Sequence, residues 1–295
     1  MAGSFKVAVF ADIHSNKRAL EACVRDSKMF GVSEYIVAGD IICDWHEPNE
    51  TIDIIRKLTP LVIKGNWEQA LSEYKAVSDI WDIYEEYASI LWTYNTLTPE
   101  NREYIKNLPK VLTAMHDDLA IRIVHGSPFN VNEGMYLDKG VERIYNALNQ
   151  ISENILIFAH THEQSCTHFG EKVAINPGSV GEHYNEECAA EYCILEISEG
   201  RLVDVVFRKV KYEFDTNFVE LLQSPLYKVA FVRLLVVYLG MCEGKNVLID
   251  FQADIDEERS KDEFAGSGPI PNDIYNMVFD DKYQQRVASK LFFGN

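Results

Sequence analysis

Residues 5–14 read FKVAVFADIH, an apolar run of strand-forming residues that ends at the polar side chains of Asp12 and His14. The same pattern returns before Asp40 and again before Asn66, where a short apolar run ends at a glycine and one polar residue. Segments with helical spacing of apolar residues separate these runs. Strands that alternate with helices predict a parallel sheet, whose carboxyl ends lie along one edge.

Two later strands are predicted to end in the same way. Residues 119–124 run into His125, and residues 155–159 run into His160 and His162. The strand-rich stretch that follows, to about residue 210, predicts a second sheet with antiparallel members. Five separate segments thus bring four imidazoles, two carboxylates and one amide to one sheet edge: Asp12, His14, Asp40, Asn66, His125, His160 and His162.

This set of side chains is typical of a transition-metal site. A lone His-x-His or Gly-Asp is usually an ordinary polar pair or a turn, so the prediction depends on the whole set in this order. Imidazole nitrogens mixed with carboxylate oxygens suit manganese, iron, zinc or cobalt, whereas calcium prefers oxygen ligands alone.

Charge and composition limit the partners. The 295 residues carry a formal net charge of −18, and no Lys/Arg cluster is longer than two residues. A long nucleic acid is therefore a poor substrate, whereas a small phosphorylated molecule is compatible with bound metal ions. Six scattered cysteines without a CxxC pair indicate a cytoplasmic protein. No membrane partner is expected, because the longest apolar run, Val229–Met241, is interrupted by Arg233 and the first residues lack signal-peptide features.

The ordered motifs resemble those of the calcineurin-like metallophosphoesterases. The resemblance covers about residues 5–210 and is carried by these motifs: Asp12-Ile-His14, Gly39-Asp40, Gly65-Asn66, His125-Gly126 and Ala159-His160-Thr-His162. Asn176-Pro-Gly-Ser179 is similar to the smaller prokaryotic branch, and Gly65-Asn-Trp-Glu68 resembles a bacterial subgroup associated with diadenosine tetraphosphate hydrolysis. The resemblance implies a four-layer α/β/β/α sandwich over residues 1–210, followed by a helical extension over residues 211–295.

The resemblance also implies a role for each ligand. Asp12, His14 and His162 would bind one metal ion, Asn66, His125 and His160 the other, and Asp40 would bridge them. Asp40, Asn66 and His125 are accordingly the expected catalytic residues. Two ions roughly 3.5–4 Å apart share a hydroxide that attacks phosphorus in line with the leaving oxygen. Manganese and iron are the expected metals, and zinc, cobalt and nickel fit the same donors.

Trp67 departs from the family pattern, since many relatives carry a histidine after the Gly-Asn motif. The indole N–H is not acidic enough to act as a general acid. We therefore expect substrates whose leaving group needs no proton, such as a nucleoside phosphate, and whether another residue supplies the proton stays open. The indole is also predicted to stack on a base; the alternative is that Trp67 only packs beneath the helical segment.

Three further residues are candidate substrate contacts. Asn16 and Arg18 lie at a predicted helix start, where phosphate groups bind readily, although such residues often simply face solvent. His183 lies close to Asn176-Pro-Gly-Ser179 and is the one of the remaining histidines that we expect to approach a substrate.

These predictions lead to a metal-dependent hydrolase of phosphoanhydride or phosphodiester bonds in small nucleotides, with diadenosine polyphosphates favoured. The alternatives are a broad-specificity phosphodiesterase or phosphomonoesterase and, in a different class, a scaffold that keeps the fold without catalysis. The extension would either cap the substrate cleft or mediate homo-oligomerisation.

Overall fold

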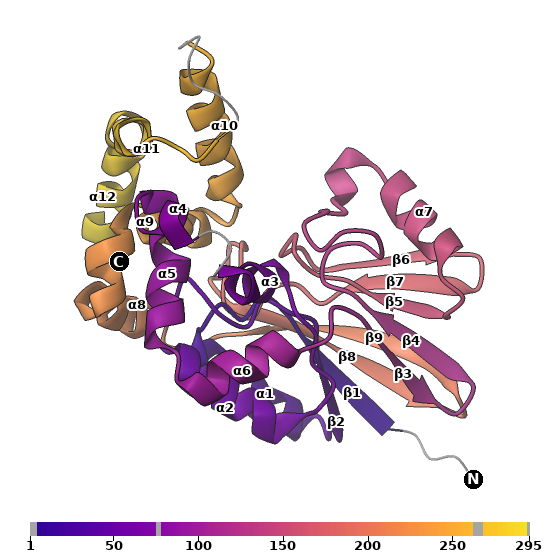
Figure 1. The fold of residues 1–295 in the computed structure, drawn as a ribbon. Coiled ribbons are helices and arrows are strands. Elements are labelled where there is room, and N and C mark those ends of the chain that lie inside the picture. The colour runs from indigo at the N-terminus through magenta and orange to yellow at the C-terminus, as the bar shows by residue number, and fades with distance from the viewer. Residues whose placement is uncertain (1–4, 75–77, 262–267, 294–295) are drawn as a thin grey trace.

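Two β-sheets stack face to face with helices on both outer sides (Figure 1), as predicted for the four-layer α/β/β/α sandwich. The structure is a computed structural model that describes residues 5–74, 78–261 and 268–293. The ends of both predicted domains, at residues 1–4 and 294–295, lie outside the described residues.

The first sheet has four strands. In spatial order they are β2 (Glu34–Val37), β1 (Phe5–Phe10), β8 (Ala190–Ser198) and β9 (Arg201–Val210). β1 pairs in parallel with β2, placing Val7 opposite Glu34, and antiparallel with β8, placing Val7 opposite Leu195. The last two strands therefore join the first sheet, which corrects the expectation that they belong to the second. β8 is buried over most of its length, which suits an interior strand.

The second sheet has five strands. In spatial order they are β3 (Leu112–His116), β4 (Leu119–Ile123), β5 (Ile155–Ile157), β7 (Lys172–Asn176) and β6 (Ser165–Phe169). β4, β5 and β7 run parallel, whereas β3 and β6 are antiparallel to their neighbours. The predicted strand at residues 61–63 is wrong: in the described chain it makes one isolated bridge, from Val62 to Val37.

Alternation along β1 divides its side chains between two cores. Val7 and Val9 pack between the sheets, whereas Ala8 and Phe10 face the outer helices. The outer helices on this side are α1 (Lys17–Met29), α2 (Pro48–Leu58) and α6 (Pro99–Asn107). On the opposite side, η3 (Leu137–Lys139) leads to α7 (Glu142–Gln150), which packs on the second sheet through a separate apolar cluster.

The segment between Asn66 and α6 is mostly helical in the part that the structure describes. It contains α3 (Asn66–Ser72), α4 (Ser78–Trp81), the 3₁₀ turn η2 (Glu85–Tyr87) and α5 (Ala88–Thr96). Figure 1 shows α4 and α5 beside the C-terminal helices at one end of the molecule, with α3 nearer the sheets. This segment therefore connects the sandwich to the C-terminal part of the chain.

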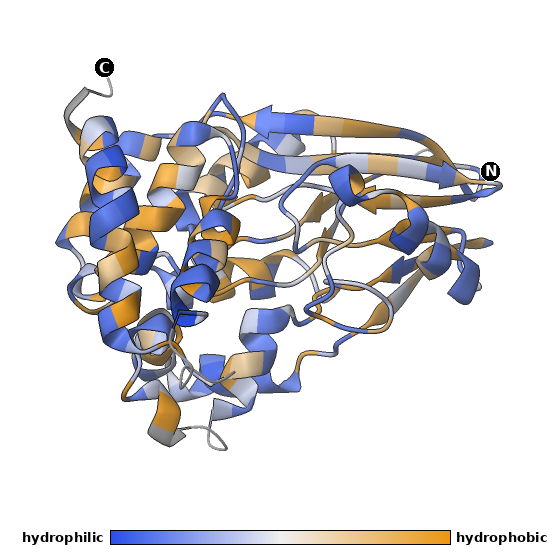
Figure 2. Cartoon of the chain, turned by 90° about the horizontal axis from the view of Figure 1, so that it is seen from above, coloured by the Kyte–Doolittle hydropathy of each residue, from blue (hydrophilic) through white to orange (hydrophobic). Residues whose placement is uncertain are grey.

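The C-terminal part is helical and has a hydrophobic core of its own. Its elements are α8 (Phe214–Gln223), α9 (Pro225–Glu243), α10 (Val247–Arg259), α11 (Asn272–Val278), the π-helical turn η4 (Phe279–Tyr283) and α12 (Gln284–Phe293). These helices alternate hydrophobic and hydrophilic residues (Figure 2), and Trp45 from the sandwich joins their core. β9 ends at Val210 and α8 begins at Phe214, beside the predicted boundary, although the division into two domains stays a prediction.

The central helix of this part is α9. It is long and apolar enough to cross a membrane by length and composition alone, but 61% of its apolar stretch is buried inside the protein. Burial on several sides by the neighbouring helices accounts for its apolar character.

Candidate metal centre

The seven predicted ligands meet at one edge of the sandwich, where the loops that follow the strands converge. One donor atom from each of Asp12, His14 and His162 lies within 4.8 Å of the others, and Asp40, His125 and His160 form a second such group. Each ligand group therefore combines a carboxylate with two imidazoles, as predicted from the strand-end motifs.

Asn66 joins the second group, and Asp12 lies between the two groups. The Asn66 Oδ1 atom lies 3.0 Å from His125 Nε2 and 2.9 Å from His160 Nδ1. Asp12 Oδ1 lies 3.6 Å from His162 Nε2 and 3.8 Å from His125 Nε2, so it lies between the groups. The structure thus brings all seven residues into one cluster; the bridging role of Asp40 stays a prediction.

Hydrogen bonds fix which ring nitrogens carry lone pairs. His125 Nδ1 donates to the Ala38 carbonyl at 2.8 Å, and His162 Nδ1 donates to the Glu182 carbonyl at 2.8 Å. Their Nε2 atoms therefore point into the cluster and are free to bind a metal ion in place of a proton. His14 Nε2 faces His162 Nε2 at 3.4 Å, while its Nδ1 faces the Glu182 carboxylate at 3.4 Å. Ring nitrogens of the first group therefore converge on the same small space.

Such an arrangement fits metal ions. Asp12 Oδ1 is buried without a hydrogen-bond partner, and His125 Nε2 faces only acceptors, including Asp40 Oδ2 at 3.1 Å. Facing acceptors repel one another unless a positive charge lies between them. Nitrogen and oxygen donors in each group suit first-row transition metals. The residues present therefore fit a pair of such ions.

The pKa values of the imidazoles also indicate that a positive charge is stabilised between the ligands. Burial lowers the pKa of His14 and of His160 to about 4, which leaves both rings neutral and able to act as ligands. Burial also lowers the pKa of His125, but the adjacent Asp40 carboxylate outweighs it and raises the value to about 10. The space between Asp40 and His125 thus strongly favours a cation.

The ligand backbones are strained. Five of the seven ligands have φ between 48° and 70°, a region that side chains other than glycine adopt rarely: Asp12, His14, Asp40, His160 and His162. Such strain persists where surrounding contacts over-determine the backbone, and it concentrates at functional sites. Ser179 Oγ donates to the Asp12 carbonyl at 2.9 Å, and Asn176 Nδ2 donates to Thr161 Oγ1 at 2.9 Å, so the Asn-Pro-Gly-Ser motif supplies some of these contacts.

Gly39 and Gly65 precede ligands because two loops touch there. A Cβ atom on Gly39, where φ is +89°, would lie 2.6 Å from the Gly65 nitrogen and 2.9 Å from His125 Nδ1. A Cβ atom on Gly65 would lie 2.0 Å from Asp40 Oδ1. The Gly-Asp and Gly-Asn motifs therefore allow the Asp40 and Asn66 loops to pack in direct contact.

Glu68 holds these loops together. Its buried carboxylate accepts hydrogen bonds from the N–H groups of Asp40, Ile41, Ile42 and Gly65, at 2.7–3.1 Å. Burial and the nearby Asp40 charge raise the pKa of Glu68 to about 7, while the hydrogen bond from Gly65 opposes the shift. Sequence reasoning placed Glu68 beside a ligand but could not show that it binds the Asp40 loop.

A second buried cluster was not predicted. Asp44 Oδ2 lies 3.8 Å from His14 Nδ1, and Glu182 Oε1 lies 3.4 Å from the same nitrogen. Arg233 from α9 pairs with Asp44 through two hydrogen bonds. Burial raises the pKa of Asp44, but Arg233 outweighs it and brings the value to about 2. Glu182 is three residues beyond Ser179, which was the available sequence signal, whereas Arg233 had none.

Asn16 and Arg18 contact the C-terminal helices. Asn16 caps α1 by accepting from the Ala19 N–H, and Asn217 donates to the same oxygen at 2.9 Å. Arg18 donates to Glu220 through Nε, at 3.1 Å, and through Nη2. These partners occupy both side chains, and their predicted contact with substrate remains a prediction.

His183 is fully buried away from the ligand groups. Its Nε2 lies 3.1 Å from the Tyr212 hydroxyl, and its ring packs edge-on against Tyr212 and Phe214. Burial lowers the pKa of His183 to about 3, so the ring is neutral. Its surroundings are those of a packed core histidine, and its substrate role stays a prediction.

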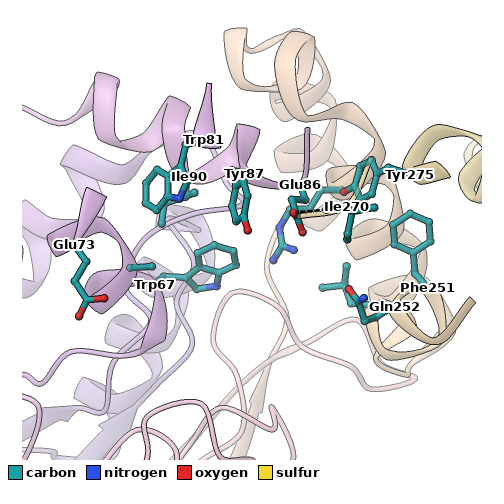
Figure 3. A pocket seen from close by; sticks show the side chains of 13 residues that line it. Trp67, Glu73, Trp81, Glu86, Tyr87, Ile90, Phe251, Gln252, Ile270 and Tyr275 are labelled. Atoms are coloured by element: carbon teal, nitrogen blue, oxygen red, sulfur yellow. Dashed lines mark hydrogen bonds between the residues drawn. The ribbon is translucent and has the colours of Figure 1, made fainter. Parts of the chain in front are cut away.

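Trp67 has separate backbone and side-chain contacts. Its N–H donates to Asp40 Oδ1 at 3.0 Å, which any residue except proline could do. The Arg233 guanidinium lies 4.7 Å from the centre of the indole ring. The half-buried indole lines a cavity on the side of α3 that faces the C-terminal helices (Figure 3).

The chain matches proteins of one family. Residues 5–200 match the calcineurin-like phosphoesterase superfamily domain. An uncharacterized protein from Methanocaldococcus jannaschii is 27% identical over 233 residues, which cover 75% of this chain and 93% of that protein.

Solved structures show the same fold. A metallophosphoesterase from Sphaerobacter thermophilus matches with a TM-score of 0.63 at 21% identity, covering 78% of this chain and 99% of its own. A hypothetical protein from Pyrococcus horikoshii OT3 matches with a TM-score of 0.67 at 23% identity, covering 77% and 97%. With the match over residues 5–200, the chain belongs to the calcineurin-like phosphoesterase superfamily, as a metal-dependent phosphoester hydrolase.

Proposed function

We propose that the protein hydrolyses phosphoanhydride or phosphodiester bonds of small nucleotides, with diadenosine polyphosphates as the favoured substrates. The observation that carries the proposal is the position of Trp67 directly after the ligand Asn66. Its N–H donates to Asp40, and its indole lines an aromatic cavity. Neither group can protonate a leaving oxygen at neutral pH.

A leaving group that is stable as an anion fits this site. The nucleoside phosphate released from an anhydride needs no proton, whereas an alkoxide released from an alkyl diester does. This difference supports dinucleoside polyphosphates over nucleic acid. The net charge of −18 also disfavours a long polyanion.

The chain's own residues fix the reacting geometry. Two bound metal ions would activate water and neutralise charge on the phosphoryl oxygens. Trp67 N–H orients Asp40, the Ala38 carbonyl orients His125, and the Glu182 carbonyl orients His162. The backbone N–H of His160, a ligand of the second group, donates to Asp12 Oδ2 at 3.2 Å. This hydrogen bond fixes the carboxylate of Asp12, a ligand of the first group. Such preorganisation lowers the barrier without further rearrangement.

A hydrolysis panel with Mn²⁺ tests the proposal. It compares a dinucleoside tetraphosphate, cyclic nucleotides, a nitrophenyl diester and an alkyl diester. We expect turnover of the tetraphosphate and the nitrophenyl diester and little of the alkyl diester. Equal turnover of all four would favour a broad-specificity phosphodiesterase, and no turnover by metal-loaded protein would favour a scaffold.

Trp67→His tests the leaving-group argument separately. An imidazole at this position should raise kcat for the alkyl diester relative to inorganic tripolyphosphate, an anhydride without a base. Trp92→His, on α5 and outside the cavity lining, is the matched control and should leave the ratio unchanged. If Trp67→His also leaves it unchanged, the leaving-group argument is wrong.

The metal identity is proposed from the nitrogen and oxygen donors of the ligands, and the location and oligomeric state are proposed from the sequence. Manganese and iron are our first choice of metals, and a metal analysis of protein purified without added metal identifies them. A cytoplasmic location and a role for the C-terminal helices in homo-oligomerisation remain predictions, which fractionation and solution mass measurements check.

A further inference from the structure

A cavity of about 590 Å³ lies between the metallophosphoesterase segment and the C-terminal helices. Figure 3 shows Trp67, Trp81 and Tyr87 on one side and Phe251 and Tyr275 on the other. We propose that this cavity binds the base of a nucleotide whose phosphates occupy the metal centre. The inference rests on the proposed function and assigns recognition of the base to the C-terminal helices.

The lining suits a flat aromatic group. Trp81 and Tyr87 are nearly parallel, with ring centres 6.0 Å apart and 16° between their planes. Phe251 and Tyr275 pack edge to face against each other on the opposite wall, at 5.3 Å and 67°. The Trp67 indole lies in the same lining and is only half buried. Aromatic side chains of this kind bind bases by stacking, and the volume falls in the range of small-molecule sites.

The cavity connects to both ligand groups through its own lining residues. Trp67 follows the ligand Asn66, and its N–H donates to Asp40. Arg233 pairs with Asp44, whose carboxylate is 3.8 Å from His14. The lining therefore includes one residue that contacts a ligand and one whose ion-pair partner faces a ligand, and on this arrangement one nucleotide would reach from the cavity to the metal centre.

The charges of the lining select the base rather than the phosphates. Among the described residues of the lining, Arg233 is the one basic side chain, and the bidentate pair with Asp44 neutralises it. Glu73 and Glu86 add carboxylates, and Gln252 adds an amide. Carboxylates repel phosphate but accept hydrogen bonds from a ring amino group. A neutral base with an exocyclic amine, such as adenine, therefore fits the lining.

The C-terminal helices supply half of this site. Arg233, Phe251 and Tyr275 come from α9, α10 and α11, whereas the matched family domain ends at residue 200. The Ile270 N–H donates to Glu86 Oε1 at 2.8 Å, which joins the two walls directly (Figure 3). The extension thus adds base recognition to a domain whose ligands provide the chemistry.

Filling the cavity tests the inference. Ala70→Trp places an indole in the lining from α3, and Ala253→Trp places the same side chain on the exposed surface of α10. With Mn²⁺ present, we expect Ala70→Trp to raise KM for diadenosine tetraphosphate about ten-fold, as loss of one stacked base implies. Turnover of inorganic tripolyphosphate should stay within about two-fold. Ala253→Trp should change neither substrate.

Binding of adenosine, measured by calorimetry, distinguishes the two proposals. The wild type and Ala253→Trp should bind adenosine, and Ala70→Trp should not. Adenosine binding without hydrolysis of any nucleotide would overturn the proposed function and keep the base site. Nucleotide hydrolysis with KM unchanged in Ala70→Trp, or equal loss for both substrates, would overturn the base site. Gln252→Trp, from the exposed rim on α10, replaces Ala70→Trp if that variant does not fold.

Discussion

Arg233 and Asp44, separated by 189 positions, form a bidentate ion pair at the junction of the C-terminal helices and the metal centre. Arg233 Nε is 2.6 Å from Asp44 Oδ1, and Nη2 is 2.7 Å from Oδ2. The Asp44 side chain is 0% exposed and that of Arg233 is 17% exposed. Because Asp44 also faces His14, this pair ties α9 to a ligand of the metal centre.

Arg233→Met should strongly destabilise the protein. It would leave the buried Asp44 carboxylate without its partner, which costs about 3–5 kcal/mol in buried pairs. Arg233→Lys keeps the charge but loses the two-pronged geometry and should cost less. Urea unfolding measures both effects. Arg233→Met combined with Asp44→Asn should cost less than the sum of the single changes, and simple additivity would contradict the coupling.

Glu68→Gln should weaken metal binding. A glutamine offers one acceptor oxygen, so it cannot serve all four N–H groups of the Asp40 and Gly65 loops. Losing a group that orients ligands typically costs 10–100-fold in metal affinity. Titration of metal-free protein with Mn²⁺ measures this loss. Glu73→Gln, at the C-cap position directly after α3, is the control and should bind Mn²⁺ as the wild type does.

The ligand set could be predicted because its signals are local. Each ligand follows a strand or, for Asn66, a short apolar run, and the glycines that allow close loop contact stand beside Asp40 and Asn66 in the sequence itself. Arg233 and Asp44 meet only through the packing of α9, and no spacing rule connects positions so far apart. Glu68 was recognisable as a first-turn acid of α3, but its four donors come from two loops that meet only in the fold.

The strands, like the ligands, could be predicted from local sequence, but their pairing could not. The apolar runs of β1 and β5 were evident from composition, since burial on both faces requires it, and β4 alternates buried apolar residues with partly exposed ones. Their sheet membership was not, because β8 pairs with β1 across more than 180 residues and composition does not encode the partner. Residues 61–63 have the strand pattern, yet only Val62 bridges to Val37 in the described chain.

Divalent metal should stabilise the chelator-treated protein. Binding to the folded state alone adds about 2.7 kcal/mol at a concentration 100 times Kd. For a chain of this size, that corresponds to a rise in Tm of about 5–10 °C with Mn²⁺. His125→Ala should show a much smaller rise in thermal melts, whereas His168→Ala, an exposed histidine on β6, should match the wild type. An equal rise in all three proteins would contradict the ligand assignment.

Glu191→Gln should stabilise the protein at alkaline pH. The side chain is 6% exposed, and burial raises the pKa of Glu191 to about 7, although Lys209, 3.7 Å away, opposes the shift. The folded state therefore holds this proton more tightly than the unfolded state, whose value is about 4.3. Stability from this group is complete below pH 4, falls as pH rises towards 7, and stays lost above it. The total is on the order of 3 kcal/mol.

Glutamine resembles the protonated acid and does not lose this contribution. Urea unfolding should therefore give similar stabilities for Glu191→Gln and the wild type near pH 4, and a more stable variant at pH 8. Glu187→Gln removes the other, exposed partner of Lys209 and should follow the wild-type pH profile. A variant less stable than the wild type at pH 8 would mean that the Lys209 pair outweighs the burial of Glu191, and the assigned direction of the pKa would be wrong.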